Sequence, residues 1–232
     1  MYHKTSMKRA KNYRAVAEKI EDRMYSFDEA IAFLTEHSKT KFDQSLEIHV
    51  RLNIDPKKGD QQVRASVTLP HGTGKERRVA VITTTMLSEA KKSGADLVGG
   101  EEMIADIKSG KFFDGKFDVL VATPEMMPKL APVARILGPK GLMPNPKSET
   151  VTTKIAQVVE SLKKGKVQFK NDSAGNVHQA VGKLSMGTEK LKENAAMFMD
   201  AVKKAKPAAA KGKYVVSISV CSTMSPGIFV QE

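Results

Sequence analysis

The chain has 232 residues, 41% hydrophobic and 28% charged, which is enough for one large domain or two modest ones with buried cores. Its formal net charge of +12 at pH 7 favours a polyanionic partner such as nucleic acid. The single cysteine, Cys221, excludes an internal disulfide, and no apolar run is long enough to cross a membrane. The N-terminus has no apolar segment of the secretory type, so we expect no signal peptide and no membrane partner, and the single cysteine is compatible with a reducing compartment.

The N-terminal third begins with charged residues 8–23, which are compatible with a helix or a basic arm. Ser26 and Glu29 have the spacing of a capping box, which predicts a helix over about 27–37. Residues 46–54, LEIHVRLNI, alternate apolar with polar side chains, and a second alternation begins at Val63. These patterns predict a long β-hairpin with one polar face.

The middle of the chain has a different periodicity. Buried strands are expected at 78–83 and 117–123 and a short strand near 96–100, with helices at about 85–93, 101–109, 125–137 and 150–164. Strands that alternate with helices predict a parallel, doubly wound sheet.

The last third returns to strand-like alternation. Strands are expected at 166–170, 177–184 and 214–222, and a helix at 189–205. In the final strand Val216, Ile218 and Val220 would share one face, and Ser217, Ser219 and Cys221 the other. The whole pattern predicts a split α+β domain, residues 1–70 and 159–232, with a Rossmann-like α/β domain inserted at 71–158.

A parallel sheet raises the alternative of a nucleotide-dependent enzyme. The first strand–helix turn, ITTTML (82–87), lacks the G-x-G-x-x-G pattern that lets a backbone approach pyrophosphate. Gly72–Lys75 is followed by Glu76 instead of a hydroxyl residue, and Pro139 within GPKG has no N–H to donate to phosphate. These departures disfavour a nucleotide site.

Other chemistry finds little support in the residue spacing. The five histidines show no paired ligand spacing, Cys221 has no partner motif, and no nucleophile elbow is present. We therefore predict no catalytic residue, no metal site and no cofactor.

The polar faces of two predicted strands are more informative. Small hydroxyl and basic groups on a sheet suit RNA, whose wide minor groove presents 2′-hydroxyls, although an ordinary solvated face would have the same pattern. The side chains concerned are Glu47, His49 and Arg51, with Ser217, Ser219 and Cys221. On the strands alone, the two interpretations stand equal.

Residues 134–147, ARILGPKGLMPNPK, closely resemble the signature of the bacterial large ribosomal subunit protein one family. SFDEA, KFDQSLEIHVRLNIDPKKGDQQVRASVTLPHGTGK, KNDSAGNVH and STMSPG agree as well, in order, so the likeness runs from about residue 26 to about residue 230. The resemblance implies that the domain made from both chain ends binds RNA. It also implies that LGPKGLMPNP is a rigid loop without a catalytic role.

The function that this resemblance implies is structural. A member would bind the stalk of the large-subunit rRNA, support the movement and release of exit-site tRNA, and repress translation of its own operon mRNA. It would be a monomer when free and would reside in the large ribosomal subunit of a bacterium, or of a plastid.

The resemblance also carries site residues. The implied RNA-binding residues are Lys41, Phe42, Ser45, Arg51, Asn171, His178, Ser217, Thr223, Met224 and Ser225. Lys41 would contact phosphate, Phe42 would pack against sugar or support its loop, and the Thr223 hydroxyl would meet RNA closely. Weaker candidates for contact with a tRNA or rRNA backbone are Lys57, Lys58, Arg135 and Lys140.

One position departs from the family pattern T-M-G-P, because Ser225 stands where the glycine is expected. Glycine allows a close backbone approach and an unusual φ. A serine would therefore either restrict the turn or add a hydroxyl contact to phosphate.

Overall fold

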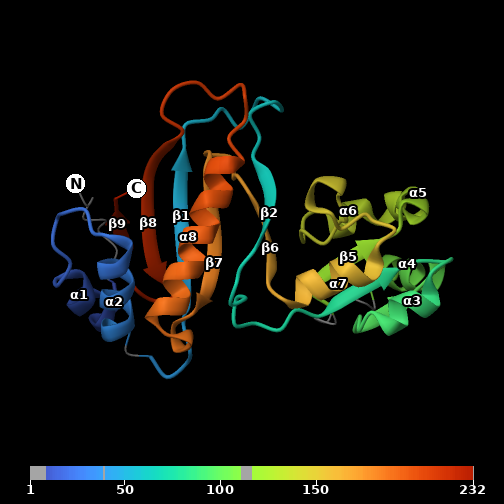
Figure 1. The fold of residues 1–232 in the computed structure, drawn as a ribbon, viewed down its shortest axis with the longest axis horizontal. Coiled ribbons are helices and arrows are strands. Elements are labelled where there is room, and N and C mark those ends of the chain that lie inside the picture. The colour runs from blue at the N-terminus through green and yellow to red at the C-terminus, as the bar shows by residue number, and fades with distance from the viewer. Residues whose placement is uncertain (1–8, 39, 111–116, 232) are drawn as a thin grey trace. The chain divides into compact units, whose positions relative to one another are not determined.

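The computed structural model describes residues 9–38, 40–110 and 117–231. The chain forms two compact units, Met1–Gly74 with Phe169–Glu232 and Lys75–Gln168. The chain passes from the first unit to the second after Gly74 and returns after Gln168, whereas the sequence analysis placed these boundaries after residues 70 and 158. Figure 1 shows the path of the chain through both units.

The first unit is built on a four-stranded antiparallel sheet with the order β7-β1-β8-β9. The strands are β1 (Ser45–Leu52), β7 (Asn176–Lys183), β8 (Val215–Ser222) and β9 (Ile228–Val230). The short strand β9 was not predicted. The strands at 177–184 and 214–222 are confirmed to within a residue.

The predicted hairpin between the first two alternations is wrong. β2 (Arg64–Thr68) is indeed a strand, but it pairs with β6 (Lys166–Lys170), while β1 pairs with β7 and β8. Alternation along a strand identifies its buried face, but it does not identify the strand's partners. Both edges of β1 are occupied by strands that come more than a hundred residues later.

Two helices cover one face of this sheet. α2 (Phe27–His37) packs against β8 and β9, and α8 (Thr188–Lys204) packs against α2 and β7 (Figure 1). The predicted capping box is confirmed: Ser26 Oγ accepts the Glu29 N–H at 3.2 Å, and the Glu29 carboxylate accepts the Ser26 N–H at 2.9 Å. α1 (Lys11–Ala17) shows that part of the charged N-terminal segment is helical.

The alternation of β8 is interrupted by a register shift. Arg51 is opposite Ser217, but Leu52 is opposite Val215, so one extra residue of β8 is accommodated there. Val216 is consequently 48% exposed, and its predicted place on the buried face with Ile218 and Val220 is wrong. Because a bulge of this kind inserts one residue, the side chains before it point to the opposite side of the sheet from the one that the alternation predicts.

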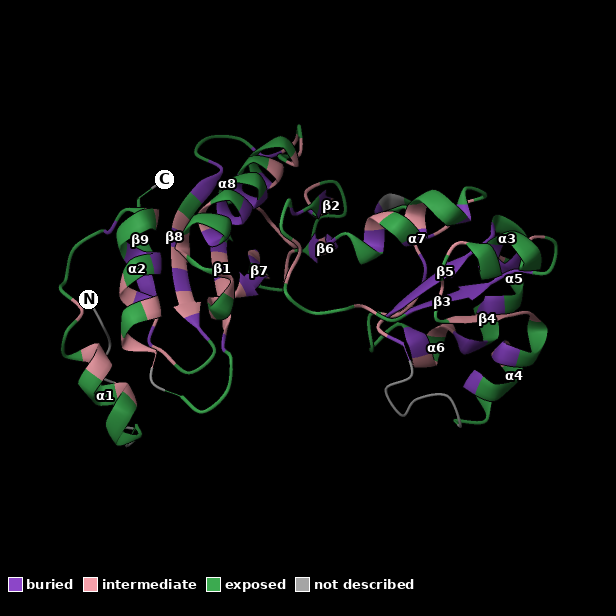
Figure 2. Cartoon of the chain, turned by 60° about the horizontal axis from the view of Figure 1, so that its bottom comes forward, coloured by how far each residue is buried: buried purple, intermediate pink, exposed green. Residues whose placement is uncertain are grey.

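The second unit has a parallel three-stranded sheet with the order β4-β3-β5, which confirms the predicted strand direction. The strands are β3 (Val79–Ile82), β4 (Leu97–Gly99) and β5 (Val119–Ala122), and every residue of β3 and β5 is buried (Figure 2). One apolar cluster joins the sheet to α3 (Leu87–Lys92) and α7 (Ile155–Lys163). A second cluster joins it to α4 (Glu101–Lys108), α5 (Met127–Leu130) and α6 (Ala134–Leu137).

Two helices of this unit differ from the prediction. The expected helix over 125–137 is divided, with 3₁₀ turns at Pro124–Met126 and Ala131–Val133 around α5 and before α6. Pro128 and Pro132 lack the N–H of a continuous helix. The helix expected from about 150 starts only at Ile155, because Val151 forms a parallel bridge with Ala122. Further 3₁₀ turns lie at Pro146–Ser148 and Leu184–Met186.

Within the described ranges, no helix has the length and apolar character that crossing a membrane requires.

Candidate nucleic-acid interface

The polar face of the four-stranded sheet is the one opposite α2 and α8. On it Glu47 is opposite Cys221, His49 is opposite Ser219, and Arg51 is opposite Ser217. The prediction that these six side chains share one face is confirmed. β7 extends the face, since His178 is opposite His49 and Asn176 is opposite Arg51.

One end of this face joins two segments that are far apart in the sequence. The Ser45 N–H donates to Thr223 Oγ1 at 3.0 Å, and the Thr223 N–H donates back to the Ser45 carbonyl at 3.1 Å. The structure thus places the Lys41–Ser45 loop beside the Thr223–Ser225 turn. Phe42 and Met224 are 53% and 60% exposed, so both present apolar side chains to solvent.

Ser225 fits its turn without backbone strain. Among the described residues, Glu149 is the single non-glycine with a positive φ, so Ser225 does not need the conformational freedom of glycine. Its Oγ accepts the Ser222 N–H at 2.8 Å, and its own N–H donates to the Ser222 carbonyl at 3.1 Å. The serine therefore stabilises the turn through hydrogen bonds to Ser222, instead of restricting it.

Gln44 is a residue that the sequence reasoning missed. It is only 3% exposed, and its Oε1 accepts the Met224 N–H at 2.9 Å. Its Nε2 donates to Ser38 Oγ and, at 3.0 Å, to Thr40 Oγ1. The side chain thus ties the end of α2 and the 41–45 loop to the Thr223–Ser225 turn. Its only sequence signal is its place inside the KFDQS stretch.

A cavity of about 480 Å³ adjoins the same turn. Tyr13 and Val16 of α1 line one side, and Gln44, Met224 and Ser225 line the other. The N-terminal segment, to which the sequence assigned no role, therefore borders the candidate site.

The other predicted residues of this unit differ in what they offer. Asn171 has its amide occupied, because Oδ1 accepts the Val63 N–H at 2.8 Å and Nδ2 donates to the Asp172 carbonyl at 2.9 Å. Its clearest role is to hold the backbone beside β6. His178 lies on the polar face, where its Nδ1 is 2.7 Å from His49 Nδ1.

Burial and neighbouring charges shift two protonation equilibria on the face. Burial, together with His178, lowers the pKa of His49. Burial and the Glu47 carboxylate raise the pKa of Cys221 to about 11, so the thiol is neutral at physiological pH.

Asp172 organises the loop before β7. Its carboxylate accepts the Asn176 N–H at 2.7 Å and the Ala174 N–H at 2.8 Å, and the bond from Asn176 is the main reason that its pKa falls to about 2. The folded pKa lies below the usual 3.8, so this contribution to stability is present above that value and is lost as pH falls toward 2.

We therefore expect the Asp172 carboxyl carbon to titrate near pH 2 by NMR, with faster amide exchange at Ala174 and Asn176 once it is protonated. Asp172→Asn should remove this pH dependence. A midpoint near 3.8 would show that the loop does not hold the carboxylate.

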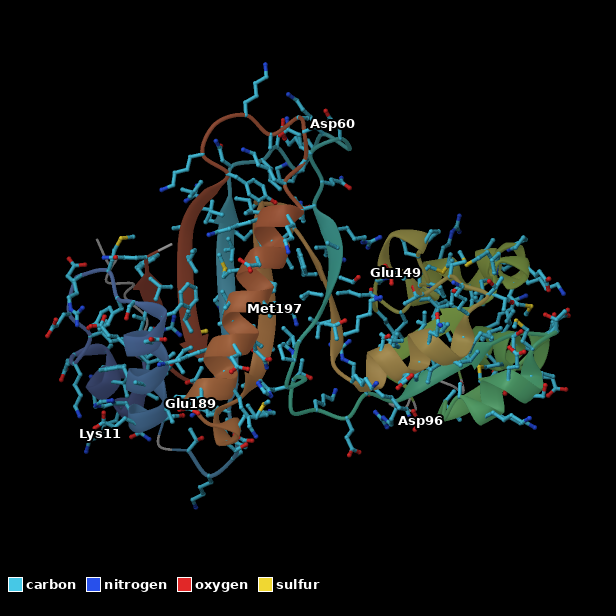
Figure 3. All side chains as sticks on the ribbon, in the orientation of Figure 1. Lys11, Asp60, Asp96, Glu149, Glu189 and Met197 are labelled. Atoms are coloured by element: carbon cyan, nitrogen blue, oxygen red, sulfur yellow. The ribbon has the colours of Figure 1, made fainter. Side chains whose placement is uncertain are left out.

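The weaker candidates lie elsewhere. Lys57 and Lys58 are exposed in the loop that also carries Asp60, labelled in Figure 3, and the Lys58 ammonium is 4.0 Å from the Asp55 carboxylate. Arg135 and Lys140 are exposed in the other unit, Lys75–Gln168.

The LGPKGLMPNP segment (137–146) is anchored to the core of its unit. Leu137 is fully buried, Leu142 and Met143 pack against the same cluster, and the Leu142 N–H donates to the Leu137 carbonyl at 3.0 Å. Gly141 has φ of +69°, which a residue with a side chain rarely adopts. These contacts are those of a packed loop.

Comparison with known proteins decides the family. The model of the ribosomal protein L1p/L10e family matches residues 34–226. The chain belongs to this family. Bacterial relatives carry the name large ribosomal subunit protein uL1: that of Mesoplasma florum is 47% identical over 224 residues, or 97% of both chains. The uL1 of Cutibacterium acnes is 48% identical over 96% of this chain and 95% of its own length.

A third uL1, from Kosmotoga olearia, is 49% identical over 95% of both chains. These matches confirm the resemblance seen in the sequence. The family is one of ribosomal proteins, so the chain is not an enzyme. The alternative of a nucleotide-dependent enzyme is therefore rejected.

Proposed function

We propose that this uL1-family chain is a structural constituent of the large ribosomal subunit in the bacterial cytoplasm, where it binds the stalk of the large-subunit rRNA. The unit made from both chain ends carries this role. The observation that supports it most is the hydrogen-bonded junction of Ser45 with Thr223, which brings Lys41, Phe42 and Ser45 together with Thr223, Met224 and Ser225 at one end of the polar sheet face.

The chemistry of the junction and of the polar sheet face suits RNA. Lys41 at the junction and Arg51 near the other end of β1 are exposed cations for phosphates, while Phe42 and Met224 at the junction offer exposed apolar surfaces against which sugars or unstacked bases pack. Ser217, on the same face as Arg51, adds a hydroxyl for a 2′-OH. The net charge of +12 supplies long-range attraction to the polyanion.

A titration of labelled stalk rRNA tests the proposal. We expect nanomolar-range affinity that falls steeply with salt, because each neutralised phosphate releases counterions. Lys92→Ala, at an exposed lysine of the other unit that is not a candidate RNA contact, is a matched charge control for Lys41→Ala and should leave binding nearly unchanged. Affinity that is the same at low and high salt would contradict the proposal.

Two finer roles extend the same proposal. With the stalk bound, the chain supports movement and release of exit-site tRNA, with Lys57, Lys58, Arg135 and Lys140 as candidate contacts to the tRNA or rRNA backbone. Through the same RNA site, the chain represses translation of its own operon's mRNA. The free protein is a monomer. A reporter translated from that mRNA tests repression: excess stalk rRNA should relieve it by competing for the site.

A further inference from the structure

Three potential metal ligands meet on the polar sheet face, although their spacing in the sequence gave no sign of it. Glu47, His49 and Cys221 each offer one ligand atom, and these atoms all lie within 4.8 Å of one another. His49 Nε2 is 3.1 Å from Cys221 Sγ. The prediction of no metal site rested on the absence of a local motif, and strand pairing supplies what the local sequence lacks.

The backbone fixes this cluster firmly. Glu47 and His49 are two residues apart on β1, so they point to the same side, and Cys221 of β8 is directly opposite Glu47. Side chains in this arrangement have Cβ atoms about 4.5–5.5 Å apart across the strands. All three are partly buried, and they lie on β1 and β8, the two inner strands of the four-stranded sheet.

The hydrogen bonds around His49 orient it as a metal ligand. With both rings neutral, Asp172 accepts from His178 Nε2 at 3.3 Å, so His178 Nδ1 is the acceptor and His49 Nδ1 donates to it at 2.7 Å. The proton of neutral His49 is thereby held on Nδ1, and the lone pair of Nε2 is directed toward Cys221. A histidine that donates its other ring N–H to a second group is the usual arrangement around protein-bound zinc.

The donor set selects the metal. A thiolate, an imidazole and a carboxylate are the ligands of Zn²⁺, whereas Mg²⁺ and Ca²⁺ prefer oxygen ligands alone. We propose that Glu47, His49 and Cys221 form a Zn²⁺ site on the open face of the sheet, with His178 and Asp172 as the outer groups that orient His49. Three protein ligands leave the fourth position for water or another oxygen ligand. Binding releases the thiol proton to solvent.

The site does not depend on the proposed RNA function, so it is tested on the free full-length protein, reduced and freed of metal. Calorimetry with Zn²⁺ should give one site per chain, and Co²⁺ should give the charge-transfer absorption of a thiolate–metal bond. Mg²⁺ should give neither signal.

The variants separate a built site from incidental binding. Cys221→Ser should abolish the charge-transfer absorption, and His49→Gln should weaken Zn²⁺ binding strongly. His178→Gln should weaken it about 10-fold through loss of orientation. His71→Gln is the matched control, because His71 pairs with Glu193 away from the cluster, and it should bind as wild type does.

Circular dichroism of the metal-free variants checks that each is folded, and Glu47→Gln supplies an independent loss of a ligand if one fails. Absence of Zn²⁺ binding to the folded wild type would overturn the proposal. So would binding that survives both Cys221→Ser and His49→Gln, since the metal would then lie elsewhere.

Discussion

Thr223→Val is expected to weaken binding to stalk rRNA about 5–150-fold, which corresponds to about 1–3 kcal/mol. Valine keeps the shape of threonine but cannot accept the Ser45 N–H, the bond that holds the turn against the 41–45 loop. It also removes the hydroxyl proposed to meet RNA. Thr223→Ser retains both functions and should stay close to wild type. The measurement is a titration of labelled rRNA at fixed salt.

The control for this result is Thr68→Val, the same substitution at an exposed threonine of β2. It should not change the affinity. Because Thr223 bonds to the backbone of β1, thermal unfolding of each variant must accompany the titration. Wild-type affinity in a folded Thr223→Val protein would move the RNA site away from this turn.

Asn194→Ala is expected to lower the free energy of unfolding by about 3 kcal/mol. Asn194 is fully buried on α8, its Oδ1 accepts the His71 N–H at 3.2 Å, and its Nδ2 donates at 2.8 Å to the carbonyls of Gly72 and Val181. Alanine leaves one N–H and two carbonyls without these partners. Each unpaired buried group costs about 1–3 kcal/mol, partly recovered where water enters.

Chemical denaturation monitored by circular dichroism measures this change. Asn53→Ala, at an exposed asparagine of the same unit, should alter stability by no more than about 0.5 kcal/mol. Below its unfolding transition, Asn194→Ala should bind rRNA as wild type does, since α8 packs on the face opposite the polar one. Equal stabilities of Asn194→Ala and Asn53→Ala would show that the buried amide bonds contribute nothing net.

The local elements were largely predictable because they depend on neighbours in the sequence. The Ser26–Glu29 capping box acts within four residues, and the alternation in LEIHVRLNI follows from the two-residue period of a strand. The same period placed Glu47, His49 and Arg51 on one face. The prediction of a continuous helix over 125–137 was wrong for an equally local reason. It followed the apolar spacing of the segment, whereas Pro128 and Pro132 interrupt the helical hydrogen bonds there.

Much of the candidate site was accessible from the sequence through its family likeness. The stretches around Lys41 and Thr223 identified both halves of the junction, but neither indicated that Ser45 and Thr223 exchange hydrogen bonds. Gln44 gave no signal, because a buried glutamine is recognised only by the groups that surround it. The sequence showed that Ser225 replaces the family glycine. Only the structure showed that its φ is not positive, so that a serine fits there without strain.

The sequence by itself determined most strands and helices, the polar alternation, the basic charge and the family, since each depends on local periodicity or on residue identity. Only the tertiary structure decided that β1 lies between β7 and β8 instead of pairing with β2. Strand pairing is set by burial and backbone hydrogen bonding over the whole sheet, which no short window of sequence contains. That pairing brings His49 to Cys221 across 172 residues of chain, and so creates the proposed zinc site.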